Sequence, residues 1–468
     1  MSGFHTVEKI GGTSMTRFAD VMNNVIIGKR KGEELYNRIF VVSAYGGITN
    51  LLLENKKTGE PGIYGFFAMD SQEWRPALEK TREEMLRLNR TFKSIGLDIA
   101  KADEFVNQRL DGLIVSLENL MSLRTFGHFK PTEYLPAARE FLAAVGEAHS
   151  AFNSTLILQA NGVNARFVDL SGWKSMENHD LDSAILSAFE GMDFAHEMPI
   201  VTGYVKCDQG IMKTFDRGYS EITFSKLAVL THAREGVIHK EFHLSTGDPK
   251  LIGEDKVEVI GNTNFDIADQ LSDMGMEAIH PKAAKQMEGQ NIPIRVKNAF
   301  DPEHPGTLIS RDYISPVPRV EMICGRNDIV AIEVHDPKMV GEPGYDYHLT
   351  ECLKNHHISY IAKTTNANTI THFVPERNRT LEACLADIRR KFPESKVETS
   401  KIGIISVIGT NMRVPGFLTR AAKTLFDAGI NVLALDQTMR QVNIQFMLNR
   451  DDFKNAQIVL HREFVEKN

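Results

Sequence analysis

The sequence predicts an α/β protein, in which a mostly parallel sheet sandwiched by helices is followed by two smaller repeats of strands and helices. Three observations support this fold class. The segment 38–44 is almost continuously apolar, which is typical of a parallel strand buried on both faces. Strands alternate with amphipathic helices up to a proline-rich linker at 315–318. Beyond the linker, the order strand, helix, strand, strand, helix occurs twice, over 329–391 and 402–464.

Length and composition exclude several classes of protein. A chain of 468 residues is too long for one hydrophobic core and predicts two to four domains. Its net charge of -7, without long blocks of one sign, argues against nucleic acid or an anionic membrane as the main partner. The sequence contains no apolar run of transmembrane length and no signal-peptide core, so we expect a cytoplasmic protein that does not enter the membrane.

The cysteines and histidines do not indicate a metal site. The four cysteines are widely separated and form no Cys-x-x-Cys pair, which argues against both a zinc site and a disulfide framework. His239 and His243, like His356 and His357, lack a third ligand at useful spacing. No residue is therefore assigned directly to a metal.

A glycine-rich turn follows the first apolar strand. Lys9 stands at the end of that strand, and Gly11, Gly12, Thr13 and Ser14 come next. The backbone N–H groups of such a turn, together with a lysine ammonium, can bind phosphate. A purely structural turn explains the glycines equally well, because glycine pairs often end strands. The Walker A motif is excluded, because here the lysine precedes the glycines.

A second glycine turn follows the strand at 38–44 and carries Ser43 and Thr49. Ligands of open α/β sheets bind beyond the carboxyl ends of the strands, so the two turns are expected to face one crevice. The segment 58–130 is a helical excursion that could form a lid, a dimer surface or a solvated hairpin. The helix after it carries Glu147, which is either an exposed carboxylate or a buried one that needs a cation.

Four polar or flexible residues, Arg217, Gly218, Ser220 and Glu221, cluster at the start of a predicted helix at 222–234. They bring a guanidinium, a hydroxyl and a carboxylate into one turn. Taken alone, this cluster is explained by helix capping, with Ser220 as the cap and Glu221 in the first turn.

Together these motifs resemble the aspartate kinases of the amino-acid kinase family that carry tandem ACT domains at the C-terminus. The resemblance covers nearly the whole chain, and details of the segment 45–62 resemble the branch associated with ectoine synthesis in salt-tolerant bacteria. The motifs that carry it are Lys9-Ile10-Gly11-Gly12-Thr13-Ser14, Val42-Ser43-Ala44 with Ile48-Thr49-Asn50, Gly146-Glu147, Arg217-Gly218-Tyr219-Ser220-Glu221, Ala268-Asp269-Gln270 to His280-Pro281, and Pro293-Ile294-Arg295-Val296-Lys297-Asn298 to Pro305-Gly306-Thr307.

The resemblance implies an amino-acid kinase fold over residues 1–315 and two ferredoxin-like ACT domains at 320–395 and 396–468. It implies transfer of the γ-phosphoryl group of ATP to the side-chain carboxylate of L-aspartate, which gives 4-phospho-L-aspartate, with Mg²⁺ bridging the phosphates. The ACT pair implies feedback binding of an amino acid, or else a dimerisation module without effector. Family members are generally homodimers or homotetramers.

The resemblance also assigns residues to sites. The catalytic group is Lys9, Gly11, Gly12 and Glu221. The substrate-binding group is Thr13, Ser14, Ser43, Thr49, Glu147, Arg217, Gly218 and Ser220. The nucleotide-binding group is Lys240, Ser245, Asp248 and Lys250, and the effector group is Asn411, Met412, Arg413 and Asn366.

The nucleotide side departs from the family pattern. His239-Lys240 stands where relatives usually carry Thr-Asp, Lys250 stands where they carry Arg, and Glu277 reverses the charge of an expected lysine. These departures keep a second hypothesis open, namely an amino-acid-binding regulatory protein with impaired catalysis. The presence of Lys9 favours the enzyme.

Overall fold

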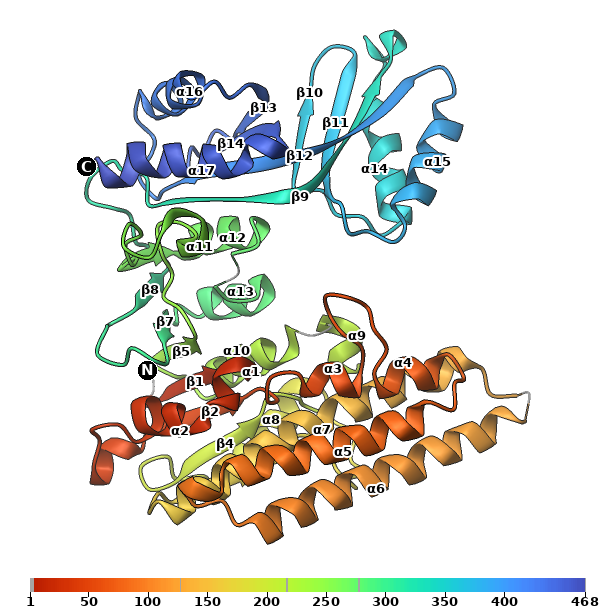
Figure 1. The fold of residues 1–468 in the computed structure, drawn as a ribbon, viewed down its shortest axis with the longest axis vertical. Coiled ribbons are helices and arrows are strands. Elements are labelled where there is room, and N and C mark those ends of the chain that lie inside the picture. The colour runs from red at the N-terminus through yellow and green to blue at the C-terminus, as the bar shows by residue number, and fades with distance from the viewer. Residues whose placement is uncertain (1–3, 127, 216–217, 277, 468) are drawn as a thin grey trace. The chain divides into compact units, whose positions relative to one another are not determined.

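The computed structural model describes residues 4–126, 128–215, 218–276 and 278–467 (Figure 1). The chain divides into two compact units. The first comprises Met1–His243 with Ile279–Arg311, and the second comprises Leu244–Ala278 with Asp312–Asn468. The domain boundaries expected near 315 and 395 remain predictions.

A mostly parallel sheet forms the centre of the first unit. The strands that the first unit contributes to it, in spatial order, are β3 (Ala165–Val168), β4 (Met198–Thr202), β2 (Arg38–Val42), β1 (Thr6–Ile10), β5 (Glu235–Lys240), β7 (Ile294–Asn298) and β8 (Thr307–Ser310). Only the pair formed by β7 and β8 is antiparallel in this series. Every residue of β1, β2 and β4 is buried, which explains the apolar runs of β2 and β4, whereas β1 buries the charged Glu8 and Lys9 among its apolar residues. The predicted parallel sheet is confirmed.

Helices cover both faces of this sheet. On one face, α10 (Tyr219–Leu230) packs against β1, β2 and β5, and α13 (Pro281–Gly289) packs against α10. On the other face lies η1 (Met22–Ile26), whose Ile26 carbonyl accepts a hydrogen bond from the side chain of Arg38. The shorter helices of the unit are α1 (Gly12–Thr16), α2 (Phe18–Val21), η2 (Gly32–Leu35), α3 (Ile48–Leu52), α8 (Leu181–Phe189) and α9 (Ile211–Phe215).

Long helices fill the predicted excursion and the segment after it. They are α4 (Ile63–Ala68), α5 (Trp74–Thr91), η3 (Lys93–Ile95), α6 (Ile99–Arg124) and α7 (Pro131–Ala160). In Figure 1, α5, α6 and α7 run side by side, and α7 also packs against β2, β3 and β4. A Cβ atom on Gly146 would lie 3.0 Å from the Cβ of Ala44. The glycine therefore lets α7 approach the turn that follows β2 closely.

The second unit contains the two predicted repeats in one antiparallel sheet. Its strands, in spatial order, are β10 (Ala362–Thr365), β11 (Thr369–Pro375), β9 (Met322–His335), β12 (Lys396–Ile408), β14 (Asn443–Asn449) and β13 (Val432–Gln437). The helices of the repeats are η5 (Pro337–Met339), α14 (Tyr345–Asn355), α15 (Leu381–Lys391), α16 (Phe417–Asp427), η6 (Arg450–Asp452), α17 (Phe453–His461) and η7 (Arg462–Glu466). The predicted βαββα order is confirmed in both repeats.

Each repeat has its own core. Val334, Leu353 and Ile388 belong to the core of the first repeat, and Ile405, Leu425 and Leu460 belong to that of the second. The first strands of the two repeats, β9 and β12, pair along most of their length and so join the two halves. The segment 244–278, which also belongs to this unit, contributes α11 (Pro249–Ile252), β6 (Asn262–Asn264) and α12 (Phe265–Asp273).

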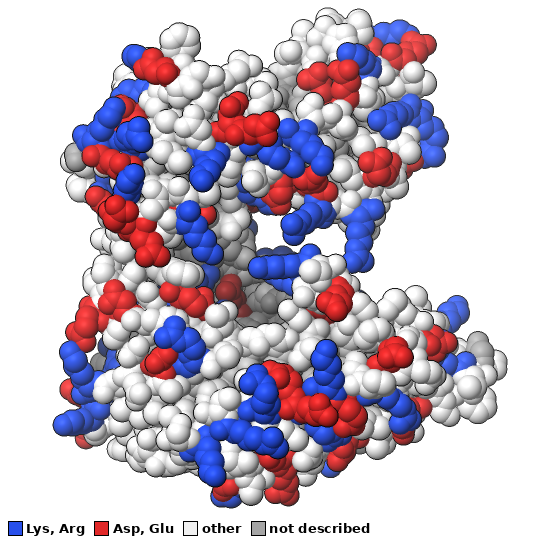
Figure 2. Space-filling model, viewed as in Figure 1, with Lys and Arg blue, Asp and Glu red and all other residues white. Residues whose placement is uncertain are grey.

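Surface charge and hydropathy agree with the composition. On the face shown in Figure 2, lysine and arginine are interspersed with aspartate and glutamate, without a continuous field of one sign. Of the helices in the described ranges, none is long and apolar enough to span a bilayer.

Candidate active site

Lys9 and Glu221 form an ion pair at the carboxyl end of β1. The Nζ atom of Lys9 lies 3.2 Å from Oε1 of Glu221, and Lys9 is only 9% exposed. The other oxygen, Oε2, accepts a hydrogen bond of 2.5 Å from the backbone N–H of His280. Burial raises the pKa of Glu221, but Lys9, Lys240 and the His280 N–H outweigh it, so the pKa lies below its usual value. Glu221 therefore carries its charge next to Lys9.

The two glycine turns lie against each other. A Cβ atom on Gly12 would come within 2.6 Å of the carbonyl oxygen of Ala44, so only glycine fits there. Between the turns, the Thr16 hydroxyl accepts a hydrogen bond of 2.8 Å from the Gly46 N–H. The Gly11 N–H donates to the carbonyl of His239 on β5, at 3.4 Å. The turns after β1 and β2 are thus adjacent, as their order in a parallel sheet predicts.

Glu147 is a buried carboxylate on α7, so the exposed alternative is wrong. It is 2% exposed, and its Oε1 accepts a hydrogen bond of 2.5 Å from the Ser220 hydroxyl. Its Oε2 has no hydrogen-bond partner within the described part of the chain. Burial raises the pKa of Glu147 to about 8, against the lowering effects of the Ser220 hydrogen bond and of Lys9. A cationic group of a ligand would satisfy this oxygen and restore the ionised form.

Two glycines allow these side chains to come together. A Cβ atom on Gly203 would lie 2.7 Å from Oε2 of Glu147 and 2.8 Å from the Cβ of Ser220. A Cβ atom on Gly218 would lie 2.5 Å from Cδ2 of His280. Gly218 was predicted to bind substrate. Gly203, which directly follows the buried strand β4, was not predicted. A glycine immediately after a buried strand was the available signal.

The remaining residues that were predicted to bind substrate differ in their burial. Ser14 is fully buried, and its hydroxyl donates to Oε1 of Glu241 at 3.1 Å, whereas Thr13 is exposed. Ser43 and Thr49 are half-buried in the turn after β2. Arg217, like Glu277, lies outside the described residues. The partner of Ser14 was not predicted, because no local pattern connects residues 227 positions apart.

Comparison with known proteins agrees with this geometry. Residues 5–298 match the model of the amino acid kinase family, and residues 405–464 match a model of the ACT domain. The chain is 48% identical to aspartate kinase Ask_Ect of Stutzerimonas stutzeri (strain A1501), over 99% of this chain and 98% of that protein. The chain belongs to the aspartate kinases of the amino acid kinase family.

More distant aspartate kinases also match over nearly the full length of the chain. Chloroplastic aspartokinase 1 of Arabidopsis thaliana is 25% identical, over 99% of this chain and 81% of that protein. The structure of Escherichia coli aspartokinase III in complex with lysine and aspartate superposes with a TM-score of 0.75 at 20% identity, over 98% of this chain and 99% of that one. At this identity the match shows the fold, and it confirms an amino-acid kinase fold with ACT domains.

The predicted nucleotide residues of this aspartate kinase fall into both units. Lys240 ends β5 in the first unit, where its charge lowers the pKa of Glu221. Ser245, Asp248 and Lys250 belong to the second unit. There the Ser245 hydroxyl donates to the carbonyl of Gly247 at 2.8 Å, and Asp248 caps α11 by accepting the Lys250 N–H at 2.9 Å. Their nucleotide role remains a prediction.

The predicted effector residues lie in different repeats. Asn366 forms the turn between β10 and β11 and lines a cavity of about 420 Å³ on the sheet. Asn411 donates from its side-chain amide to the carbonyl of Ser315, at 2.9 Å. Met412 is buried in the core of the second repeat, whereas Arg413 is exposed. The effector role of all four stays a prediction, and the burial of Met412 gives its side chain a packing role.

Proposed function

We propose that this chain, as a cytoplasmic enzyme, transfers the γ-phosphoryl group of ATP to the side-chain carboxylate of L-aspartate and so forms 4-phospho-L-aspartate. The observation that carries the proposal is the placement of Lys9, beside Glu221, within electrostatic range of the buried Glu147. Lys9 can neutralise a phosphate. Glu147 can accept an ammonium group.

The reaction needs charge neutralisation more than proton transfer. The attacking carboxylate has an ordinary pKa of about 3.9 and is already ionised at neutral pH. The barrier arises because this anion must approach a polyanionic phosphate chain. Positioning and electrostatic stabilisation therefore supply most of the catalysis in phosphoryl transfer. A buried ammonium at the end of a central strand suits that task.

Different residues of the site are proposed to bind the phosphoryl group and the aspartate. Lys9 and the N–H groups of Gly11 and Gly12 bind the transferring phosphoryl group, the Gly11 N–H in place of its long hydrogen bond to the His239 carbonyl. Glu221 orients Lys9 before the nucleotide arrives. Glu147 accepts the ammonium of aspartate through its free oxygen, Oε2. The other residues proposed to contact aspartate or the phosphoryl group are Thr13, Ser14, Ser43, Thr49, Arg217, Gly218 and Ser220.

Mg²⁺ is proposed to arrive with the nucleotide. In the ranges that the structure describes, no group of three or more His, Cys, Asp or Glu side chains is arranged to hold a metal ion. Mg²⁺ usually keeps several waters and binds substrate phosphates with one or two carboxylates from the protein. When bound, it would neutralise part of the phosphate charge.

Regulation and assembly follow from the second unit. Its paired repeats support an amino-acid effector, with Asn366, Asn411 and Arg413 as the proposed contacts, and self-association into a homodimer or homotetramer. The relative named aspartate kinase Ask_Ect supports a place in the ectoine-associated branch. The downstream product would then be an osmolyte as well as amino acids.

The decisive experiment measures ADP release from Mg·ATP with and without L-aspartate and traps the acyl phosphate with hydroxylamine. The native chain, Lys9→Ala and Lys29→Ala are compared. Lys29 is a matched control, because its side chain is 86% exposed and, among the residues that the structure describes, forms an ion pair with Glu303 alone. We expect aspartate-dependent hydroxamate that is lost in Lys9→Ala and retained in Lys29→Ala. Aspartate binding by calorimetry without any turnover of the native chain would instead establish the regulatory protein.

A further inference from the structure

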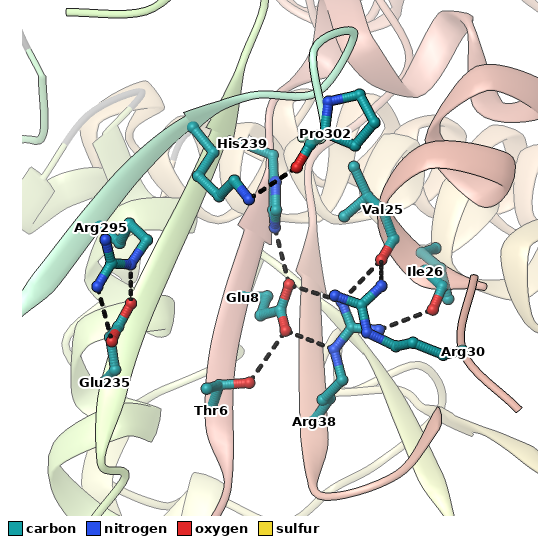
Figure 3. A network of polar contacts seen from close by, with 11 residues as sticks. Thr6, Glu8, Val25, Ile26, Arg30, Arg38, Glu235, His239, Arg295 and Pro302 are labelled. Atoms are coloured by element: carbon teal, nitrogen blue, oxygen red, sulfur yellow. Dashed lines mark hydrogen bonds and ion pairs between the residues drawn. The ribbon is translucent and has the colours of Figure 1, made fainter. Parts of the chain in front are cut away.

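A polar cavity of about 630 Å³ lies against the sheet of the first unit, on the face opposite to Lys9. Side chains alternate between the two faces of a strand, so Glu8 points away from the face to which its neighbour Lys9 points. On β5 the cavity is lined by Glu235 and His239, and on β7 by Arg295 and Lys297. Figure 3 shows several of these side chains on their strands. The cavity is therefore separate from the Lys9–Glu221 pair.

The topology explains why polar side chains occupy this face. Helix α13, which precedes β7, packs against α10 on the Lys9 face. On the opposite face, β5 and β7 present the charged residues Glu235, Arg295 and Lys297 at alternate positions. Charged side chains in the middle of a sheet face are costly unless they are paired or bind a ligand.

The carboxylates that the strands direct to the cavity already have partners. Glu8 receives two hydrogen bonds from Arg38, at 2.6 and 3.0 Å, and one from His239, at 2.8 Å (Figure 3). Burial raises the pKa of Glu8, but Arg38 and His239 outweigh it and hold the pKa well below its usual value. Glu235 pairs with Arg295 at 2.6 Å. These acids therefore cannot neutralise further cations.

Within the described ranges, two cations in the cavity wall donate hydrogen bonds to carbonyl oxygens alone. Arg30 donates to the Val25 carbonyl at 3.0 Å, and Lys297 donates to the Pro302 carbonyl at 3.1 Å. Among the described residues, neither has a carboxylate within ion-pair distance. Burial lowers the pKa of both groups, helped by Arg38 at Arg30 and by Arg295 with Arg30 at Lys297. These effects outweigh the carboxylates that raise the two pKa values, namely Glu8 at both groups, Glu34 at Arg30 and Asp301 at Lys297. The cavity wall around Arg30 and Lys297 thus has an excess of positive charge.

The mouth of the cavity does not cancel this charge. Glu33 and Glu34 line it, but both are exposed, and the carboxylate of Glu34 accepts the Lys31 N–H at 3.2 Å. Arg234, also exposed, adds a further cation to the lining. Exposed carboxylates are screened by water, so they compete weakly for Arg30 and Lys297.

His239 supplies an unused acceptor. It is 5% exposed, and its Nε2 lies 2.8 Å from the ionised Glu8, so this nitrogen must carry the proton. Burial lowers the pKa of His239, which keeps the ring neutral. Its Nδ1 is then a buried acceptor, for which the described residues provide no donor. A ligand that carries a hydroxyl group would satisfy it.

We propose that this cavity binds a small oxyanion that also carries a hydroxyl group, such as hydrogen phosphate. Arg30 and Lys297 bind its negative oxygens, and Nδ1 of His239 accepts its hydroxyl. The site adjoins the phosphate turn, because the His239 carbonyl accepts the Gly11 N–H and Glu8 precedes Lys9.

The test is a calorimetric titration with inorganic phosphate at pH 7.5. It uses the full-length Lys9→Ala variant, which removes the charged contact that Lys9 offers to phosphate in the active site. We expect one saturable site that weakens at least tenfold when Lys297→Met or Arg30→Gln is added. Adding Lys29→Met, which removes a neighbouring exposed cation, should leave the affinity unchanged. Thermal unfolding of each variant verifies that the chain is folded.

Sulfate provides the matched ligand. It resembles phosphate in shape and charge but has no hydroxyl donor at this pH, so it should bind more weakly. Sulfate binding as tight as that of phosphate would overturn the role given to His239. Titrations that do not saturate, or that respond equally to Lys29→Met and Lys297→Met, would overturn the site itself. The Lys9→Ala background keeps this result independent of whether the chain phosphorylates aspartate.

Discussion

Lys9 and Glu221 lie 212 positions apart in the chain, and their side chains meet at 3.2 Å. Glu221 lies in the first turn of α10 and also accepts a hydrogen bond from the backbone N–H of His280, the residue that precedes α13. One carboxylate therefore connects a central strand to the starts of two helices. Because the pair is buried, the ammonium is held in place before a nucleotide binds.

Removing the charge of Glu221 should impair catalysis more than folding. In Glu221→Gln the neutral amide orients Lys9 less well, and we expect kcat to fall about tenfold to a hundredfold, or roughly 1.4–2.7 kcal/mol in the activation barrier. The measurement is steady-state ADP release at saturating ATP and aspartate. Glu190→Gln, which changes an exposed glutamate, is the control. An unchanged kcat in Glu221→Gln would show that Lys9 needs no orienting partner.

The raised pKa of Glu147 predicts a pH-dependent affinity for aspartate. With a pKa of about 8, Glu147 is mostly protonated at pH 7, and an incoming ammonium must displace that proton. The Kd of L-aspartate should therefore fall about tenfold per pH unit between pH 6 and 7 and level off above pH 8. Calorimetry in buffers of different ionisation enthalpy measures both Kd and the released proton.

The variant Glu147→Gln separates this effect from other titrations. It removes the charge that attracts the ammonium, so we expect weaker binding and a Kd that no longer depends on pH in this range. Proton release should disappear as well. If native Kd is flat between pH 6 and 8, Glu147 does not face the ammonium.

Glu147 should also affect the pH dependence of stability. A carboxyl group whose pKa is raised on folding binds more protons in the folded state, so the free energy of unfolding decreases as the pH rises from about 4.5 to 8. The expected slope is roughly 1.4 kcal/mol per pH unit from this group alone. Urea unfolding of the native chain and Glu147→Gln at pH 6 and 8 measures it, and the difference between the two proteins should change with pH.

Arg38 should be essential for stability, because it neutralises Glu8 in a buried setting. In Arg38→Met the carboxylate loses its bidentate partner, and we expect a loss of about 3–5 kcal/mol in the free energy of unfolding. The double variant Glu8→Gln with Arg38→Met leaves no unpaired charge and should recover part of that loss. Urea unfolding at pH 7 compares them, and equal stabilities of the single and double variants would contradict this explanation.

Gly203 should tolerate no side chain. A Cβ atom there would crowd Oε2 of Glu147 and the Cβ of Ser220, so Gly203→Ala should raise the KM for aspartate at least tenfold, or roughly 1.4 kcal/mol. Gly289→Ala is a matched control, because an added Cβ atom at Gly289 meets no atom within 4 Å. Initial-rate kinetics over a range of aspartate concentrations distinguish the two variants, and an equal KM would place aspartate elsewhere.

Local features of the sequence predicted most of the elements. The apolar run at 38–44, the glycine pair after Lys9 and the repeated strand and helix order each correspond to an observed strand, turn or repeat. These predictions succeed because burial and backbone conformation act over a few neighbouring residues. The glycine motifs and their order along the chain also identified the family.

Pairings across the chain required the tertiary structure. The contacts of Glu221 with His280, of Ser14 with Glu241 and of Glu8 with His239 join elements brought together by the strand order. The inclusion of residues 244–278 in the second unit has no signal in the composition either.

The sequence by itself thus determined the class of fold, the turn that carries Lys9 and the family of the enzyme. Only the tertiary structure decided that Glu147 is buried with an unpaired oxygen, and that a cationic cavity lies on the opposite face of β1. The physical reason is that burial and pKa depend on everything packed around a side chain, and most of those neighbours are distant in the chain.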